Sequence, residues 1–290
     1  MKEGKDVVVG LGEIGLPILK LLSKHHTVVG YDIRSRLMNQ KKFDKYKDLD
    51  TNFLHVCIPF SKKFQSNIKN LYKQFSPKCI VIHSTVSPHT TEKLQSIFKI
   101  PVIYSATRGV HRRMLSDLKK YTKFYAIDKN APNKKWASQI FSLTLKKSGI
   151  KTKKMSDPLT LELAKILVDT SYYGWLINYA QLSDIIAKRH NVDYDEMWSF
   201  ADEIHKFLGN RPKMYPGFIG GHCVIPNLSL IDEKSLWQID EINRFFAKKV
   251  KKRKTKNKNL EMIENKKESC FFNWDKSRLW KTKTSHRCSE

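Results

Sequence analysis

The glycine spacing near the start of the chain constrains the fold more than any other feature. Three glycines follow the apolar run Val7 to Val9 in the sequence VVVGLGEIGLP. A GxGxxG turn between a strand and a helix uses its glycines for a tight turn, for close backbone approach to a pyrophosphate and for close helix packing. The unpaired N–H groups at the helix start then bind the anion. We therefore predict a dinucleotide site formed by Gly10, Gly12, Glu13, Ile14 and Gly15.

A carboxylate and two arginines after the next apolar run bear on which dinucleotide this is. Asp32 follows the run Thr27 to Tyr31 directly. A carboxylate at this place accepts hydrogen bonds from the ribose hydroxyls of NAD and repels the 2′-phosphate of NADP. Asp32 therefore favours NAD as the cofactor. Arg34 and Arg36 are suited to hold a 2′-phosphate, so NADP stays open, as does a glycine turn that binds no nucleotide.

The first 155 residues alternate short apolar runs with helical patterns. This alternation predicts the α/β class, as a Rossmann-type doubly wound parallel sheet with helices on both faces. Helical patterns include Ile14 to Lys24 and Lys62 to Phe75. The predicted strands are Val7 to Val9, Thr27 to Tyr31, Phe53 to Ile58, Cys79 to His83, Val102 to Tyr104 and Phe124 to Ile127.

The pattern becomes helical after Asp157-Pro158, a helix start with proline at the first position. One long helix is predicted from Leu159 to His190 and a second from Tyr194 to Leu208, followed by a loop rich in glycine and proline up to Asn227. We therefore predict three parts. Residues 1–155 form the dinucleotide-binding domain, residues 156–245 a small all-α domain, and residues 246–290 a basic, disordered tail.

Composition excludes several classes of protein. The chain of 290 residues is 40% hydrophobic, which is enough for a globular core. Five widely separated cysteines without a CxxC pair argue against a disulfide framework and a zinc ribbon, and no metal site is predicted. There is no leader-like apolar segment and no apolar run of about 18 residues. We expect a cytoplasmic protein that does not span a membrane.

The charge balance points to an anionic partner. Lysine and arginine number 54 against 28 acidic residues, a net charge of +26. Such a field attracts phosphates, anionic sugars or nucleic acid, although lysine drift in a low-GC genome produces the same balance. The densest run is KKVKKRKTKNK, from Lys248 to Lys258, and only this tail is expected to bind nucleic acid.

Two further patterns carry chemistry. In LELAKILVDTSYYG the polar residues Glu162, Lys165, Asp169 and Tyr172 share one helix face, and a solvated stripe of ion pairs is the simplest interpretation. In YPGFIGGHCVIPN, Cys223 lies among glycines that allow close approach to a ligand. It becomes a nucleophile if a cation such as His222 or Lys165 stabilises its thiolate. An inert thiol is the alternative.

In this order, the three elements resemble the UDP-glucose/GDP-mannose dehydrogenase family across residues 5–245. The cysteine loop is most similar to the UDP-N-acetyl-hexosamine dehydrogenase type. GLGEIGLP with Asp32 resembles the cofactor turn, and HVCIP, which ends at Pro59, resembles the third-strand segment. HSTVSPHT resembles the loop that would place Ser84 and Thr85 beside the nicotinamide.

The resemblance implies NAD-dependent oxidation of a CH–OH group of a sugar or nucleotide sugar, in a homodimer formed through the long helix. Cys223 would capture an aldehyde as a thiohemiacetal, and a second hydride transfer would give a thioester that water cleaves. Lys165 matches a lysine that stabilises the oxyanion. Positions matching the family's substrate residues are Arg211, Gly220, Gly221 and His222.

Departures from the family pattern leave alternatives open. Asp169 stands where the family has asparagine and Asn227 where it has aspartate, so two catalytic side chains are exchanged. Thr107 stands where the family has a glutamate linked to thioester hydrolysis, which puts oxidation to the acid in doubt. The 45 residues from 246 to 290 have no similarity to the family's third domain. A two-electron hydroxyacid-type dehydrogenase and a degenerate NAD-binding protein with a polyanion-binding tail are the alternatives.

Overall fold

The structure is a computed structural model that describes residues 4–109, 111–171 and 186–201, together with single residues between 204 and 248. The chain divides into two compact units, Met1–Met197 and Trp198–Glu290. The boundaries expected near residues 155 and 245 remain predictions. Within the described residues, no helix is long and apolar enough to cross a membrane.

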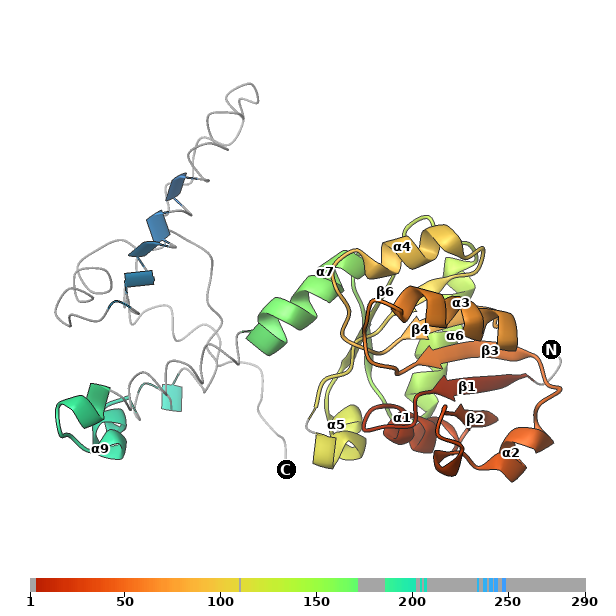
Figure 1. The fold of residues 1–290 in the computed structure, drawn as a ribbon, viewed down its shortest axis with the longest axis horizontal. Coiled ribbons are helices and arrows are strands. Elements are labelled where there is room, and N and C mark those ends of the chain that lie inside the picture. The colour runs from red at the N-terminus through yellow and green to blue at the C-terminus, as the bar shows by residue number, and fades with distance from the viewer. Residues whose placement is uncertain are drawn as a thin grey trace, which may run out of the picture. The chain divides into compact units, whose positions relative to one another are not determined.

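A seven-stranded sheet forms the centre of the first unit, in the order β2-β1-β3-β4-β5-β6-β7 (Figure 1). The strands β1 to β5 are parallel, whereas β6 runs antiparallel to β5 and β7 is parallel to β6. Their bounds are β1 Lys5–Val9, β2 Val28–Tyr31, β3 Thr51–Val56, β4 Cys79–Ile82, β5 Val102–Tyr104, β6 Lys123–Ile127 and β7 Thr152–Lys154. The predicted doubly wound α/β fold is confirmed. The reversal at β6 was not predicted, because apolar runs carry no information on strand direction.

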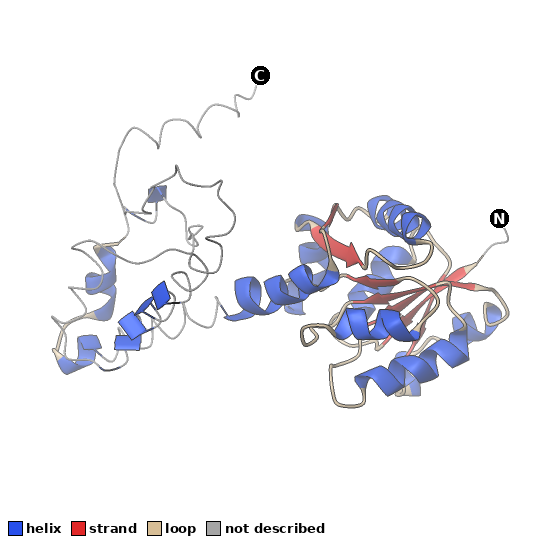
Figure 2. Cartoon of the chain, turned by 90° about the horizontal axis from the view of Figure 1, so that it is seen from above, coloured by secondary structure: helices blue, strands red, loops and turns tan. Residues whose placement is uncertain are grey.

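Helices cover both faces of this sheet (Figures 1 and 2). One face packs against α1 (Gly15–Leu22), α5 (Met114–Lys120) and α6 (Lys134–Lys147). The other face packs against α3 (Phe64–Phe75), α4 (Thr90–Ile97) and α7 (Pro158–Leu163). Because both faces are covered, the parallel strands are continuous apolar runs and not alternating patterns. Other helices within the described residues include η1 Ser35–Leu37, α2 Gln40–Lys45, η2 His111–Arg113, η3 Ala164–Ser171 and α9 Tyr194–Ser199.

An irregularity between β1 and β3 is compensated by a side chain. The register of the two strands shifts between Lys5 and Val7. The intervening Asp6 is buried, and its Oδ1 accepts the backbone N–H of Phe53 at 3.1 Å. A buried N–H without a partner costs about 1–3 kcal/mol, so Asp6 stabilises the sheet at this point.

The predicted helix start at Asp157 is confirmed. The Asp157 side chain caps α7 by accepting the N–H of Thr160 at 2.9 Å, and Pro158 occupies the first turn. The predicted helix continues over Ala164–Ser171 as a π-helix, which the sequence pattern did not distinguish from an α-helix. Over two turns, i→i+5 and i→i+4 hydrogen bonding give similar apolar spacing, and sequence periodicity cannot distinguish them. Residues 172–185 of the predicted long helix lie outside the described residues.

Replacement of the helix cap tests this element. Hydrogen bonds from the side chain and backbone of Thr160 lower the pKa of Asp157, so its carboxylate contributes stability above its unfolded-state pKa and loses it as pH falls through the folded-state pKa. We expect Asp157→Ala to lower the free energy of unfolding by about 1 kcal/mol at pH 7, measured by urea denaturation. Asp157→Asn can still cap the helix, so its free energy of unfolding should decrease much less. An equal loss in both variants would contradict the capping role.

Candidate active site

The residues predicted to bind the cofactor gather at one edge of the sheet. Gly10 follows β1, Asp32 follows β2, Pro59 lies beyond β3 and Ser84 lies beyond β4. These strands are parallel, so their carboxyl ends meet at the same edge. Ligands of open α/β sheets bind outside the carboxyl ends of the strands. We call this edge the carboxyl edge.

The glycine turn is shaped by close backbone contacts. Gly10 has a φ of +85°, and a Cβ added there would lie 2.9 Å from the carbonyl oxygen of Cys57. A Cβ on Gly15 would lie only 1.9 Å from the carbonyl oxygen of Gly10. A Cβ on Gly12 would meet no atom within 4 Å. Two glycines are therefore required by the fold itself, whereas Gly12 presents bare backbone to open space, as contact with a pyrophosphate requires.

The start of α1 is also suited to an anion. Ile14 occupies the N-cap position and supplies no side-chain hydrogen bond to the helix. It is half-buried against the core, whereas Glu13 is exposed. Because the cap side chain is apolar, it does not compete with an external anion for the N–H groups of the first turn.

Asp32 is held beside the turn by hydrogen bonds. It is 7% exposed, and its Oδ2 accepts the N–H of Leu11 at 2.7 Å. Its Oδ1 accepts the backbone N–H of Arg34 at 2.9 Å and faces the Arg34 Nε at 3.4 Å. Burial opposes ionisation, but the hydrogen bonds from Arg34 and Leu11 outweigh it and lower the pKa of Asp32. The group is therefore an anion at neutral pH, and it lies beside the glycine turn.

The loops after β3 and β4 are joined. The Ser84 hydroxyl is buried and donates to the carbonyl oxygen of Ile58 at 2.5 Å. Pro59 and Thr85, which flank this contact in the sequence, are exposed. The two loops thus form one rim of the carboxyl edge, with Pro59 and Thr85 accessible from outside.

Lys165 and Asp169 lie on the π-helix and contact each other. The Lys165 ammonium donates to Asp169 Oδ2 at 2.6 Å, and the two side chains are 13% and 37% exposed. Glu162, in the same predicted stripe, is fully buried, and its Oε1 accepts the backbone N–H and the hydroxyl of Thr91 at 2.8 and 2.6 Å. The interpretation as a solvated stripe is therefore wrong for Glu162, because it anchors α7 to α4.

The remaining predicted residues stay predictions. They lie outside the described residues, and they are Tyr172, Arg211, Gly220, Gly221, His222, Cys223 and Asn227.

Sequence reasoning missed a buried polar network on the face of the sheet that α1, α5 and α6 cover. His55 lies in β3, His83 directly follows β4, and Lys123 begins β6; all three are buried. Their ionisable side chains interrupt the apolar runs FLHVCIP, IVIHST and TKFYAI. Ionisable residues within otherwise apolar strands were the sequence signal that could have revealed this network, because such groups need a hydrogen-bond partner when they are buried.

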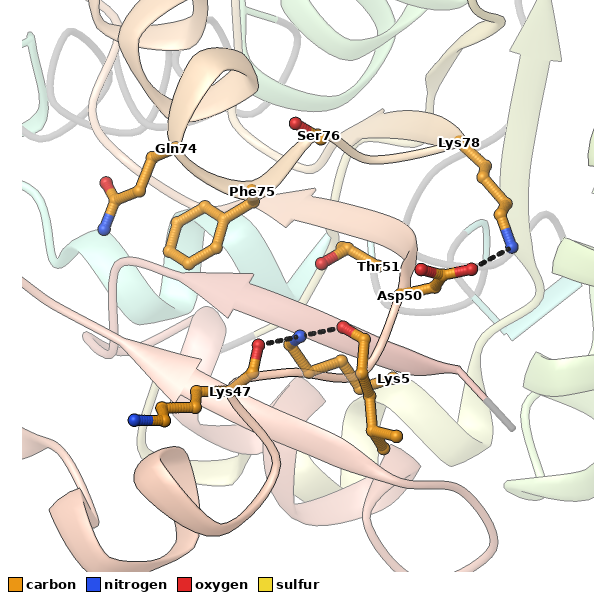
Figure 3. A pocket seen from close by; sticks show the side chains of 9 residues that line it. Lys5, Lys47, Asp50, Thr51, Gln74, Phe75, Ser76 and Lys78 are labelled. Atoms are coloured by element: carbon orange, nitrogen blue, oxygen red, sulfur yellow. Dashed lines mark hydrogen bonds and ion pairs between the residues drawn. The ribbon is translucent and has the colours of Figure 1, made fainter. Parts of the chain in front are cut away.

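A hollow of about 330 Å³ lies at the opposite, amino edge of the sheet (Figure 3). Lys5 lines it, and its ammonium donates to the backbone oxygens of Leu49 and, at 3.0 Å, of Lys47. Lys78 pairs with Asp50 at 3.3 Å in the same hollow. The ammonium groups of Lys5 and Lys78 are thus bonded to other groups of the protein. They also lie at the edge of the sheet opposite to the one where the dinucleotide is predicted to bind.

Comparison with known proteins supports the resemblance seen in the motifs. No protein-family model matches the chain. The UDP-N-acetyl-D-mannosamine dehydrogenase of Methanococcus vannielii is 24% identical over 278 residues, which cover 80% of this chain and 62% of that relative. A relative of the same name from Methanococcus maripaludis is 24% identical over 277 residues. The chain thus spans 62% of the length of the curated relatives that it matches.

Solved structures show the same fold. The UDP-D-ManNAc dehydrogenase of Pyrococcus horikoshii matches with a TM-score of 0.58 and 21% identity, over 88% of this chain and 72% of that one. The UDP-N-acetyl-mannosamine dehydrogenase Cap5O of Staphylococcus aureus matches with a TM-score of 0.54 and 17% identity, over 90% and 72%. The Rossmann-type architecture is thereby confirmed.

Alanine substitutions at two glycines separate a binding turn from a purely structural one. Gly12→Ala places its methyl in open space, so its melting temperature should stay within about 2 °C of wild type, while dinucleotide affinity falls at least about tenfold. Gly15→Ala forces its methyl against the Gly10 carbonyl oxygen and should melt several degrees lower. Thermal melts and NADH fluorescence titrations measure both effects. Unchanged NADH affinity in Gly12→Ala would favour a turn that binds no nucleotide.

Proposed function

We propose that this chain is an NAD-dependent dehydrogenase that oxidises the CH–OH group of a nucleotide sugar of the UDP-N-acetyl-D-mannosamine type. The observation that carries the proposal is the carboxyl edge, where the open Gly12 backbone lies one residue from the Leu11 N–H that binds Asp32. The similarity of 80% of the chain to UDP-N-acetyl-D-mannosamine dehydrogenases supports the substrate class.

The residues described at the carboxyl edge have the chemistry that NAD binding requires. The backbone at Gly12 and the first N–H groups of α1 would hold the pyrophosphate. Asp32 would accept the ribose hydroxyls, and the Arg34 side chain, which is 57% exposed, is free to move aside for them. Ser84 and Thr85 would lie at the nicotinamide end. When bound, the cofactor supplies the hydride acceptor for the reaction.

Lys165 is proposed to stabilise negative charge on the substrate oxygen. As a hydride leaves carbon and the hydroxyl proton passes to solvent, the oxygen carries developing charge that a fixed ammonium stabilises. Asp169 would hold that ammonium through the 2.6 Å ion pair. Cys223 is the proposed nucleophile that adds its thiol to the aldehyde. A second molecule of NAD would accept the hydride of the thiohemiacetal while its hydroxyl proton passes to solvent, and water would cleave the resulting thioester to the acid and the free thiol, with Asn227 assisting.

Further parts of the proposal concern the whole protein. Substrate binding is assigned to the loop with Arg211, Gly220, Gly221 and His222. A homodimer would form through the helix that begins at Pro158, the basic tail would bind polyanions, and the location would be the cytoplasm. These proposals rest on the sequence and on the family resemblance.

A two-electron dehydrogenase of the hydroxyacid type is the second candidate. It uses the glycine turn and Lys165 but needs no cysteine. Thr107, buried at the carboxyl edge in place of a glutamate, favours this candidate because a hydroxyl is a much weaker base than a carboxylate. The candidates differ in the number of NADH molecules formed per substrate.

Turnover of nucleotide sugars tests the proposed function. We expect UDP-N-acetylmannosamine and NAD to give two NADH per substrate, recorded by absorbance. One NADH per substrate would favour the two-electron dehydrogenase. If no NADH forms while the protein still binds NAD, the degenerate NAD-binding protein is favoured. Cys223→Ser should abolish acid formation and keep NADH affinity.

The role of Lys165 has its own test. Lys165→Ala should lower kcat about 100-fold or more, because one charge-stabilising donor contributes about 2.7 kcal/mol or more. Lys154→Ala removes the same charge from an exposed position on β7 and should leave kcat unchanged. A decrease below about threefold in Lys165→Ala would confine this residue to its ion pair with Asp169.

Cofactor preference follows from Asp32. NAD should bind at least about tenfold tighter than NADP, because a charge-assisted hydrogen bond contributes about 1.5 kcal/mol or more. Asp32→Ala should weaken NAD binding and reduce the difference between the affinities for NAD and NADP. Arg34→Ala should leave the affinity for NAD nearly unchanged. Isothermal titration of both dinucleotides measures this. Equal affinities in the wild type would assign the pocket to Arg34 or Arg36.

A further inference from the structure

Lys123 is a buried cation at the carboxyl edge. It is the first residue of β6, and because β6 runs antiparallel to β5, its side chain lies near the carboxyl end of β5. The residue is 5% exposed. Its ammonium donates to the carbonyl oxygens of Ser105 and Ala106 at 3.0 and 3.4 Å and to the hydroxyl of Thr107 at 3.0 Å. All three proton donors of Lys123 are thus directed to the segment that follows β5.

That segment in turn holds the end of β4. The N–H of Thr107 donates to the His83 carbonyl oxygen at 3.3 Å, and His83 Nδ1 lies 3.2 Å from the Ser105 carbonyl oxygen. A carbonyl only accepts hydrogen bonds, so the His83 proton is on Nδ1, and His83 Nε2 accepts from His55 Nδ1 at 2.9 Å. His83 directly precedes Ser84. The network therefore connects Lys123 to the loop that we place at the nicotinamide end.

The charge of Lys123 is stabilised by neutral oxygens. Within the described part of the chain no ion pair joins it to a carboxylate, and Asp117 of α5, which lines a small hollow with Lys123, pairs with Arg113. Burial lowers the pKa of Lys123 to about 7; the Cys57 thiol opposes this shift, and Arg108 and Lys165 add to it. Burial, with Lys123 and His55, lowers the pKa of His83 well below its ordinary value, so this ring is neutral. The proton on Lys123 is therefore lost near neutral pH.

We propose that Lys123 is a positioning residue for the nicotinamide end of the cofactor: while protonated, it fixes Ser105–Thr107 and, through His83, the loop Ser84–Thr85. A neutral amine has only two protons for the three oxygens, so the segment loosens as pH rises. Cofactor affinity then decreases with pH, although Lys123 does not touch the cofactor. This inference rests on the proposed function.

NADH titrations between about pH 6 and pH 9 test the proposal, because this range spans the loss of the Lys123 proton. NADH is the probe since its nicotinamide ring is uncharged. Wild-type affinity should fall about fivefold to tenfold with rising pH, as a hydrogen bond to a charged donor is lost. Lys123→Met should bind weakly at every pH, with no such decline. Lys123→Arg keeps its charge over this range and should bind without the decline.

Two matched variants complete the experiment. Thr107→Val removes one acceptor at constant volume and should bind about threefold more weakly, while the decline with pH persists. Lys119→Met removes an exposed lysine of α5 and should follow the wild type at every pH. If Lys123→Met does not fold, Lys123→Arg and Thr107→Val decide the question.

Two outcomes overturn the proposal, and they are distinguishable. Wild-type affinity and pH profile in Lys123→Met, or a wild-type decline with pH in Lys123→Arg, would reduce Lys123 to a structural residue and leave the proposed function intact. A wild-type chain that binds no NADH would overturn both this proposal and the proposed function.

Urea unfolding follows the titration of Lys123 in the absence of cofactor. The pKa of Lys123 is lower in the folded state than in the unfolded state. Its titration should therefore make the free energy of unfolding rise with pH above about 7. Lys123→Met should lack that rise.

Discussion

The approach of α1 to the end of β1 is the contact on which the rest of the carboxyl edge depends. Gly15 lies so close to the Gly10 carbonyl oxygen that no side chain fits between them. This contact aims the start of α1 at the space above the turn, where Gly12 is bare. It also places the Leu11 N–H against Asp32, which fixes β2 beside β1. A turn, a helix terminus and a carboxylate are thereby arranged for one ligand.

Burial determines the chemistry available along this edge. Asp32 stays ionised although it is buried, because backbone N–H groups satisfy both of its oxygens. Burial lowers the pKa of Lys123, whose ammonium donates to neutral oxygens of Ser105, Ala106 and Thr107. Two buried charges thus respond differently to pH. For Asp32 the hydrogen bonds from Arg34 and Leu11 outweigh the effect of burial on the pKa, whereas for Lys123 burial dominates.

The carboxyl edge also departs from the pattern that the family resemblance implies. Thr107 is bonded to Lys123, so the place of an acidic residue is taken by a hydroxyl beside a cation. At the π-helix, Lys165 has a carboxylate partner in Asp169 where the family pattern has an amide. Both changes alter the charge of the side chains around Lys123 and Lys165.

Local patterns in the sequence determined the strand runs, the glycine turn, Asp32 and the helix start at Asp157, because each depends on backbone geometry within a few residues. The sequence also placed Lys165 and Asp169 on one helix face. Only the tertiary structure decided the direction of β6, the burial of Glu162 against Thr91, and the network from His55 to Lys123. Those features join residues far apart in the chain. Spacing along the sequence does not determine which buried polar groups meet, since the strand order that brings them together is a property of the whole sheet.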